Sequence, residues 1–300
     1  MTITGLSAFP LTPLHDDRVD ERAFAGLVER AAAAGVDSIT ALGSTGSYAY
    51  LTADERRRVA RLALAHAGST PVFVGVGALR TSHVLALARD AQDAGAAAVL
   101  VAPVSYQPLT DDDVFGLFDE LTAAVEVPVI VYDNPATTRF DFTDALYARI
   151  AQLTGVASIK IPGVPADPDA ARARVDGIRD AVPPGVTIGV SGDASAATGL
   201  NAGCDAWYSV IAGTLPGPAV ALTRAARSGD AAAAVAASDR LQPLWELFAE
   251  FGGSFRVIAA IAEMAGLVQP DSIPRPLRGL DAAARERVGR VVRDLGLLPS

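Results

Sequence analysis

The chain repeats one pattern along most of its length: a short apolar segment rich in β-branched residues, then a longer segment with helical periodicity. Parallel strands need a long crossover between them, and a helix usually supplies it. The strand-like segments are residues 3–9, 37–42, 71–76, 97–102, 128–132, 156–160, 186–190 and 205–210. This alternation predicts an α/β protein built on a parallel sheet.

An alternating chain can close into a barrel or form an open doubly wound sheet. Roughly 30 residues separate successive strand-like segments, and no GxGxxG motif follows the first of them, which favours a (β/α)8 TIM barrel. Only helical segments remain after about residue 213, at 217–228, 230–250, 254–265 and 281–295. We predict a barrel over residues 1–213 that carries the active site. A C-terminal helical extension over 214–300 packs on it, with Trp245 and Phe248 expected in the core.

Charge and cysteine content narrow the classes of function. The formal net charge is -9, so the field of the protein repels phosphate, and we expect no binding to nucleic acid or to an anionic membrane. The single cysteine, Cys204, excludes an intramolecular disulfide and a cysteine-based zinc site. No apolar run is long enough to cross a bilayer, and no export signal is found. We expect a cytoplasmic protein without a metal or another cofactor.

Lysine occurs once in the chain, at position 160, whereas the other basic residues are all arginine. Lys160 ends the sixth strand-like segment, and the carboxyl ends of barrel strands hold the active site. Desolvation favours the neutral amine, which attacks carbonyl groups, whereas a guanidinium stays protonated. We predict that Lys160 is a catalytic nucleophile. The alternative is a structural lysine that pairs with a carboxylate such as Asp193.

Other polar residues follow the ends of neighbouring strands. The GSTGS segment places Ser44 and Thr45 in a glycine-flanked turn whose backbone N–H groups could bind a carboxylate, although an ordinary loop has the same composition. Tyr132 ends the fifth strand-like segment, where its phenol could transfer protons or could simply be a core hydroxyl. Tyr208 lies in the eighth. Because these strand ends meet at one face of a barrel, we expect a single site there.

Several motifs recur in a recognisable order: Thr12-Pro13, GSTGS before Leu51, YDNP at 132–135, SIK at 158–160 and SGD at 191–193. In these motifs the chain resembles the dihydrodipicolinate synthase and N-acetylneuraminate lyase family of class I pyruvate-type aldolases. The resemblance implies that Lys160 forms a Schiff base with a 2-keto acid and that Tyr132 is the general acid and base. It also implies that Ser44 and Thr45 bind the substrate carboxylate, that Ser44 extends a proton relay from Tyr132, and that the main chain near Tyr208 lines the pyruvate site.

The chain departs from the synthases of this family at positions that serve the second substrate. Thr137 stands where the synthases have an arginine five residues after the tyrosine, and the nearest arginine is Arg139. The tyrosine that a second subunit contributes in the synthases falls at Ser105, beside Tyr106. We therefore expect an altered second-substrate site, with Arg139 and Tyr106 as candidate substrate-binding residues.

These observations predict a Schiff-base-forming lyase, aldolase or dehydratase that acts on pyruvate or a related 2-keto acid. The alternatives are a 4-hydroxy-tetrahydrodipicolinate synthase proper and a non-catalytic protein that binds a keto acid. A metal-dependent enzyme using Asp133 and Asp193 has less support, because the three histidines fall in loops or helices without ligand spacing. The resemblance further implies a homo-oligomer, either a tetramer or a dimer.

Overall fold

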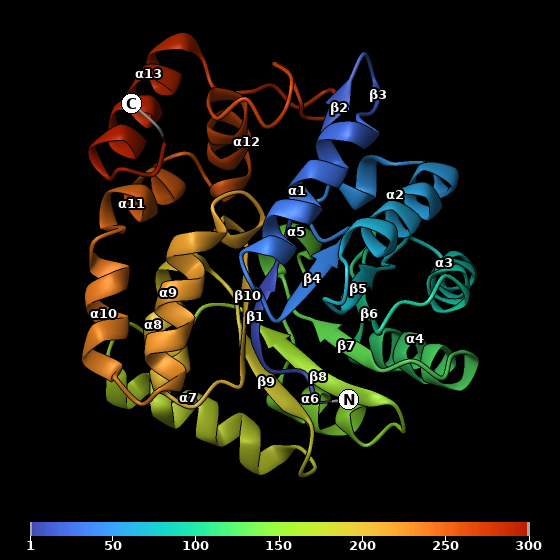
Figure 1. Cartoon of the computed structure of the whole chain (residues 1–300). Coiled ribbons are helices and arrows are strands. Elements are labelled where there is room, and N and C mark those ends of the chain that lie inside the picture. Colours follow the sequence, from blue (N-terminus) through green and yellow to red (C-terminus); the bar gives the residue numbers. More distant parts are fainter. Residues whose placement is uncertain (1, 299–300) are drawn as a thin grey trace.

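The computed structural model describes residues 2–298 and contains eight parallel strands that close into a barrel (Figure 1). The strands are β1 (Gly5–Ala8), β4 (Ser38–Ala41), β5 (Val72–Gly75), β6 (Ala98–Val101), β7 (Val129–Tyr132), β8 (Val156–Ile161), β9 (Thr187–Val190) and β10 (Ala206–Ser209). Closure occurs at β1, which pairs with both β4 and β10. Each predicted strand segment overlaps one of these strands, so the predicted (β/α)8 barrel is confirmed.

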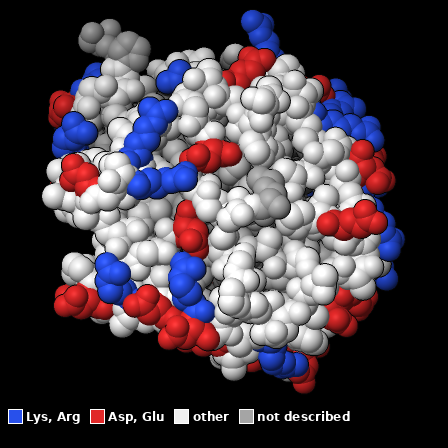
Figure 2. Space-filling model, turned by 60° about the horizontal axis from the view of Figure 1, so that its bottom comes forward, with Lys and Arg blue, Asp and Glu red and all other residues white. Residues whose placement is uncertain are grey.

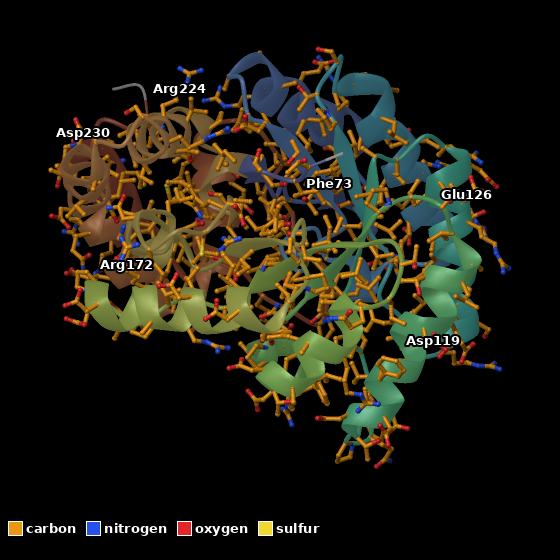
Figure 3. The ribbon with its side chains drawn as sticks, turned by 90° about the horizontal axis from the view of Figure 1, so that it is seen from below. Phe73, Asp119, Glu126, Arg172, Arg224 and Asp230 are labelled. Carbon is orange, nitrogen blue, oxygen red and sulfur yellow. The ribbon has the colours of Figure 1, made fainter. Side chains whose placement is uncertain are left out.

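Helices surround the barrel. They are α1 (Glu21–Ala33), α2 (Ala53–His66), α3 (Thr81–Asp93), α4 (Asp111–Ala124), α6 (Asp144–Ala151), α7 (Pro168–Ala181), α8 (Ala196–Asn201) and α9 (Pro216–Arg227). Seen from below, Phe73 lies among the strands while Asp119 and Arg172 lie on outer helices (Figure 3). A capping box starts α2: the Thr52 hydroxyl accepts the Glu55 N–H at 3.3 Å, and the Glu55 carboxylate accepts the Thr52 N–H at 2.8 Å. This cap fixes where the loop after β4 ends.

The C-terminal extension contains α10 (Ala231–Asp239), α11 (Gln242–Glu250), α12 (Ser254–Met264) and α13 (Ala282–Asp294), and α10 packs on α9. The single helix predicted over 230–250 was wrong, because the chain breaks between α10 and α11 at Arg240 and Leu241. Pro243 in the first turn of α11 explains the break, since a proline has no N–H to donate and its ring clashes with the carbonyl four residues earlier. The domain boundary at residue 213 remains a prediction.

Two short features were not predicted from the sequence. The strands β2 (Leu14–His15) and β3 (Arg18–Val19) form a small antiparallel hairpin between β1 and α1. The short helix α5 (Pro135–Thr138) directly follows β7 and begins at the proline of the YDNP motif. A proline fits the first helical turn because the N–H it lacks would have no partner there. Helix α5 therefore places the residues after Tyr132 at the rim of the barrel.

The strands alternate between two apolar layers. Along β7, Ile130 and Tyr132 belong to the cluster inside the barrel, whereas Val129 and Val131 pack in the layer between the strands and the helices. Side chains on a strand point to opposite faces in turn, so every second residue enters the barrel. Strand β8 pairs with β7 so that Lys160 is level with Tyr132. Both side chains therefore point into the interior, at the carboxyl ends of their strands.

The surface carries charges of both signs. Figure 2 shows acidic and basic side chains interspersed on one face rather than gathered into a patch of one sign. Ion pairs such as Arg174–Asp144 at 2.6 Å and Arg58–Glu21 at 2.8 Å connect neighbouring helices. Within residues 2–298, none of the helices has both the length and the apolar character that crossing a bilayer requires.

Candidate active site

Lys160 is buried in the barrel, with 5% of its surface exposed. Its Nζ lies 4.1 Å from the centre of the Tyr132 ring and 5.9 Å from the centre of the Phe9 ring. Burial lowers the pKa of the Lys160 amine to about 7, although the charges of Asp133 and Asp193 act to raise it. Among the described residues, Lys160 has no ion-pair partner. The alternative of a lysine held in an ion pair with Asp193 is therefore not what the structure contains.

Three polar side chains meet beside this amine. The Tyr132 hydroxyl donates to Ser44 Oγ at 3.0 Å, and Asn134 Nδ2 donates to Ser44 Oγ at 3.0 Å and to the Tyr132 oxygen at 2.9 Å. Burial raises the pKa of Tyr132, and the hydrogen bonds from Ser44 and Asn134 oppose that rise. The phenol is therefore protonated at neutral pH and oriented by two partners.

Ser44 reaches this position through a tight turn after β4. Leu42 and Ser47 have φ angles of 61° and 56°, in the left-handed region that side chains rarely adopt, and the Ser47 N–H donates to the Ser44 carbonyl at 3.0 Å. The turn runs over β5 at Gly75, where a Cβ atom would lie 1.9 Å from the Leu42 carbonyl oxygen. Glycine at 75 therefore makes room for the turn that carries Ser44.

Asp193 organises the chain after β10. Its carboxylate accepts the backbone N–H of Ile211 at 2.8 Å, the N–H of Val210 at 3.1 Å and the indole N–H of Trp207 at 3.2 Å. Burial raises the pKa of Asp193 to about 6, against the effect of these hydrogen bonds. The SGD motif thus fixes one wall of the site, and its carboxylate is ionised at neutral pH.

Asp133 is a buried carboxylate whose charge acts on Lys160. The Tyr147 hydroxyl donates to Asp133 Oδ2, whereas the other oxygen, Oδ1, is buried without a hydrogen-bond partner in the described part of the chain. Burial raises the pKa of Asp133 to about 6, and the nearby charge of Lys160 opposes the rise. Asp133 is therefore an electrostatic neighbour of the amine. Residues 2–298 contain no group of three His, Cys, Asp or Glu side chains that could hold a metal ion.

One cavity of about 830 Å³ lies at the carboxyl ends of the strands, and it is lined by Lys160, Tyr132, Ser44, Asn134 and Asp193 but not by Asp133. Of the predicted site residues, the structure brings Lys160, Tyr132, Ser44, Thr45 and Tyr208 to it. The Tyr208 hydroxyl lies 2.9 Å from the hydroxyl of Ser158, which holds it deep in the barrel.

The other two predicted residues lie elsewhere. Tyr106 is 91% exposed in the loop after β6, and Arg139 is an exposed residue at the end of α5, so neither lines this cavity. Arg139 has a φ angle of 55° as the C-terminal cap of α5. Because its side chain is exposed and outside the cavity, Arg139 does not take the place of the missing arginine within this chain.

The sequence analysis missed several residues of the cavity. Asn134 could have been found, because it is a polar residue two positions after Tyr132 at a strand end. Trp245 and Phe248 were expected in the core; both are buried, and both also line the cavity. No local pattern in α11 indicates that this helix reaches the mouth of the barrel.

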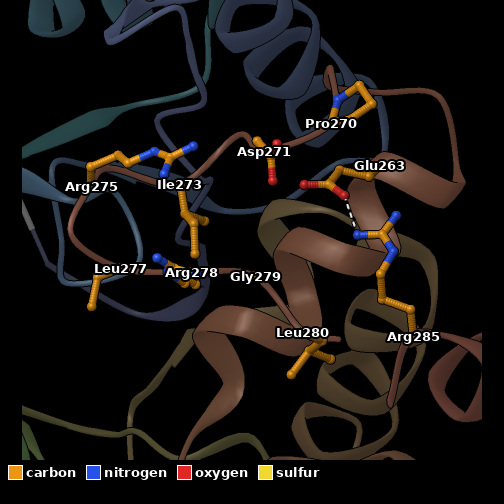
Figure 4. Close-up of a pocket in the computed structure, with 10 residues that line it drawn as sticks. All are labelled: Glu263, Pro270, Asp271, Ile273, Arg275, Leu277, Arg278, Gly279, Leu280 and Arg285. Carbon is orange, nitrogen blue, oxygen red and sulfur yellow. Dashed lines mark hydrogen bonds and ion pairs between the residues drawn. The ribbon is translucent and has the colours of Figure 1, made fainter. Parts of the chain in front are cut away.

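A separate hollow of about 510 Å³ lies in the C-terminal extension, between α12, α13 and the segment between them (Figure 4). Arg275, Arg278 and Arg285 contribute to it, and Arg285 pairs with Glu263. Leu277 lines both this hollow and the barrel cavity. In Figure 4, the side chain of Arg275 extends toward Asp271, whereas the side chain of Leu277 points away from Asp271.

Comparisons with known proteins agree with this geometry. The sequence profile of the Dihydrodipicolinate synthetase family matches residues 2–295. The chain is 33% identical over 293 residues to a 4-hydroxy-tetrahydrodipicolinate synthase of Methylococcus capsulatus, covering 97% of both chains. A second synthase, from Phenylobacterium zucineum, is 33% identical over 291 residues, which is 96% of each chain.

Solved structures of dihydrodipicolinate synthases superimpose closely on this chain. A dihydrodipicolinate synthase from Agrobacterium tumefaciens superimposes with a TM-score of 0.93 at 44% identity, covering 97% of this chain and 98% of that one. A putative dihydrodipicolinate synthetase from Pseudomonas aeruginosa gives 0.89 at 27% identity, covering 98% of this chain and all of that one. The chain therefore belongs to the dihydrodipicolinate synthetase family and is a lyase of the class I aldolase type.

Proposed function

We propose that this lyase forms a Schiff base between Lys160 and pyruvate or a related 2-keto acid, and then makes or breaks a bond at the neighbouring carbon. One observation carries the proposal: a buried amine with a pKa of about 7 lies against Tyr132, whose hydroxyl is held by Ser44 and Asn134. A neutral amine and a positioned phenol are the two groups that imine formation requires.

Imine formation begins when the neutral Lys160 amine attacks the keto carbon, and the carbonyl oxygen takes up a proton. The carbinolamine then loses that oxygen as water, for which a second proton is needed. In this proposal Tyr132 delivers that proton and recovers it from the nitrogen side; the hydrogen bond from its hydroxyl to Ser44 supports this role. The barrel interior around Lys160 is largely closed to solvent, which favours loss of water over its return.

Ser44 and Thr45 would bind the carboxylate of the keto acid. Both line the cavity next to Lys160, and Ser44 already accepts hydrogen bonds from Tyr132 and Asn134, so its own proton is free to point at an anion. Asn134 donates to Ser44 and Tyr132 but an amide cannot pass a proton on. We assign Asn134 the role of holding both oxygens in place for the relay.

The protonated imine then acts as an electron sink. When a base removes a proton from the neighbouring carbon, the imine takes up the electron pair of that C–H bond to give an enamine, which can attack an aldehyde. The imine can instead accept the electron pair of a C–C bond as that bond breaks. The enamine can also expel a hydroxyl group from the carbon bonded to the enamine carbon, which is a dehydration. The proposal therefore covers an aldolase and a dehydratase, which differ only in the group that leaves or enters.

Two alternatives make different predictions. A synthase proper, the activity for which the relatives are named, would form 4-hydroxy-tetrahydrodipicolinate. Thr137 at the cavity, in place of a cation, argues against it. A non-catalytic binding protein would hold a keto acid without turnover, although the shifted pKa of Lys160 has no evident use in such a protein.

We also propose that the chain assembles into a homo-oligomer, a dimer or a tetramer. Support comes from large apolar side chains left on the surface, Tyr106 at 91% and Leu79 at 66% exposure. A cytoplasmic location is proposed as well, because the chain has one cysteine and Cys204 is buried as a free thiol.

Exchange of the pyruvate methyl protons in D2O tests the proposal without a second substrate. Enamine formation and return replaces those protons with deuterium, which proton NMR follows directly. We expect rapid exchange with the wild type and none above background with Lys160→Arg, which keeps a charge but lacks a nucleophile. Equal exchange by both proteins would contradict the Schiff base, and tight keto-acid binding without exchange would favour the binding protein.

A further inference from the structure

Much of the cavity wall outside the barrel strands is aromatic or aliphatic. Three separate segments contribute to it: the turn that contains Tyr48, the helix α11, and the chain from Gly252 to Phe255 that leads into α12. Trp245 and Phe248 of α11 are 4% and 9% exposed, and their ring centres lie 5.5 Å apart. Leu277 lines the cavity as well. Aromatic and aliphatic surfaces of this kind bind apolar groups.

Several polar groups of the cavity are already hydrogen-bonded within the protein. The indole N–H of Trp245 donates to the carbonyl and to the hydroxyl of Ser238, at 3.1 and 3.2 Å. The hydroxyls of Thr137 and Thr138 both donate to the Asn134 carbonyl, at 3.2 and 3.0 Å. An incoming group therefore meets an indole and two threonine donors that already have acceptors, whereas Ser47 Oγ is buried at the cavity without a partner among the described residues.

Within the described part of the chain, no second cation faces this space. Among residues 2–298, Lys160 is the only Lys or Arg that lines the cavity. The buried Arg56 stacks on Tyr48 at 5.3 Å from the ring centre, and its guanidinium donates to the carbonyls of Gly75 and Gly77, at 2.9 Å each. Arg275 and Arg278 line the separate hollow of Figure 4.

Asp193 also lines the cavity, and its buried carboxylate is ionised at neutral pH while it accepts the N–H groups of Val210 and Ile211. A second carboxylate on the substrate would lose its hydration here and find no cation beyond Lys160 among the described residues. Burial of an unpaired carboxylate is strongly unfavourable. An aryl or alkyl group of the same shape would instead pack against Trp245 and Phe248.

We propose that the second substrate, or the distal half of the cleaved keto acid, is an apolar aldehyde with an aryl or alkyl group and no carboxylate. This inference rests on the proposed Schiff-base function. The enamine carbon attacks the aldehyde carbon, the aldehyde oxygen takes a proton from Tyr132, and water then releases Lys160. The product is a 4-hydroxy-2-keto acid with an apolar group at its fourth carbon, and the water consumed balances the water lost when the imine formed.

Matched pairs of aldehydes test this directly, with pyruvate saturating and product formation followed by chromatography. The pairs are benzaldehyde with 4-carboxybenzaldehyde, and butanal with succinic semialdehyde, which differ mainly in one carboxylate. We expect kcat/KM to favour the apolar member of each pair by about 100-fold or more, since the carboxylate is left unpaired. Equal turnover, or a preference for the carboxylate, would overturn the inference.

Variants of Thr137 and Trp245 test whether the discrimination against carboxylate aldehydes arises at the cavity wall. Thr137→Arg adds a cation to the cavity wall and should reduce the ratio of kcat/KM between the apolar aldehyde and its carboxylate partner by at least about tenfold. Thr137→Gln, which is neutral, should leave this ratio unchanged. Trp245→Ala should lower kcat/KM for benzaldehyde more than for succinic semialdehyde. An unchanged preference in Thr137→Arg and in Trp245→Ala would show that the selectivity arises elsewhere.

Exchange of the pyruvate methyl protons distinguishes a failure of this inference from a failure of the Schiff-base function on which it rests. Exchange of the pyruvate methyl protons without preference for apolar aldehydes, or without turnover of any of the four, refutes the substrate class and leaves the Schiff base standing. Absence of exchange refutes both.

Discussion

The pH dependence of imine formation follows from the burial of Lys160. With a pKa of about 7, the amine is neutral in roughly one molecule in ten at pH 6 and in about nine of ten at pH 8. The rate of imine formation should rise about tenfold over that interval and then level off. A lysine with the ordinary pKa of 10.5 would be neutral in only about one molecule in 300 at pH 8, and its rate would keep rising above pH 9.

The assay is a timed quench with borohydride in the presence of pyruvate, followed by intact-mass measurement at each pH. Asp133→Asn provides the perturbation, because the charge of Asp133 is the larger of the two that raise the pKa of Lys160. Removing that charge should move the midpoint of the pH dependence of trapping to lower pH. Asp119→Asn, an exposed carboxylate on α4, is the control and should leave it unchanged. A midpoint near 10, or an upward movement in Asp133→Asn, would refute the reasoning.

Three further predictions concern the supporting residues. Tyr132→Phe should lower the rate of pyruvate proton exchange by about 10²- to 10⁴-fold with little change in KM, and an unchanged rate would exclude the phenol as the acid. Asn134→Ala should lower kcat about tenfold. The hydrogen bond from Asn134 lowers the pKa of Tyr132, so its loss should raise that pKa and move the alkaline limb of the pH profile to higher pH. A fall in kcat with no movement of the limb would indicate a purely structural role. Gly189→Ala should reduce the free energy of unfolding in urea by about 1–3 kcal/mol, since its Cβ would lie 2.2 Å from the Tyr208 ring; Gly116→Ala in α4, with open space around it, should be neutral or stabilising, and equal effects would contradict the packing argument.

The barrel was predictable because its signal is local and repeated. Each strand needs a few consecutive β-branched residues, each helix needs a periodic apolar face, and the short connections permit few topologies. The broken helix over 230–250 shows the limit of that signal, because an apolar pattern can continue through Pro243 while the backbone does not.

The pyruvate half of the site was predictable for a geometric reason. Strand ends of a barrel converge, so a lone lysine at the end of β8 and a tyrosine at the end of β7 had to meet, and the pairing of Tyr132 with Lys160 brings them level. The hydrogen bonds of Asn134 were not predictable, because they depend on the turn into α5.

The distal half depends on contacts between elements far apart in the sequence. Trp245 and Phe248 form an ordinary amphipathic face in α11, and only the packing of that helix against the barrel mouth turns the face toward Lys160. Arg139 shows the reverse. Its position near Thr137 in the sequence indicated the site, whereas in the fold it is exposed and lies outside the cavity.

Borohydride trapping of pyruvate with peptide mapping tests the Schiff base most directly, because the chain has one lysine. The account predicts one reduced pyruvyl group on Lys160 of the wild type. The double variant Lys160→Arg with Arg172→Lys also has one lysine, on the exposed face of α7, and should acquire none. An unmodified Lys160, or equal modification of the wild type and the double variant, would contradict the account.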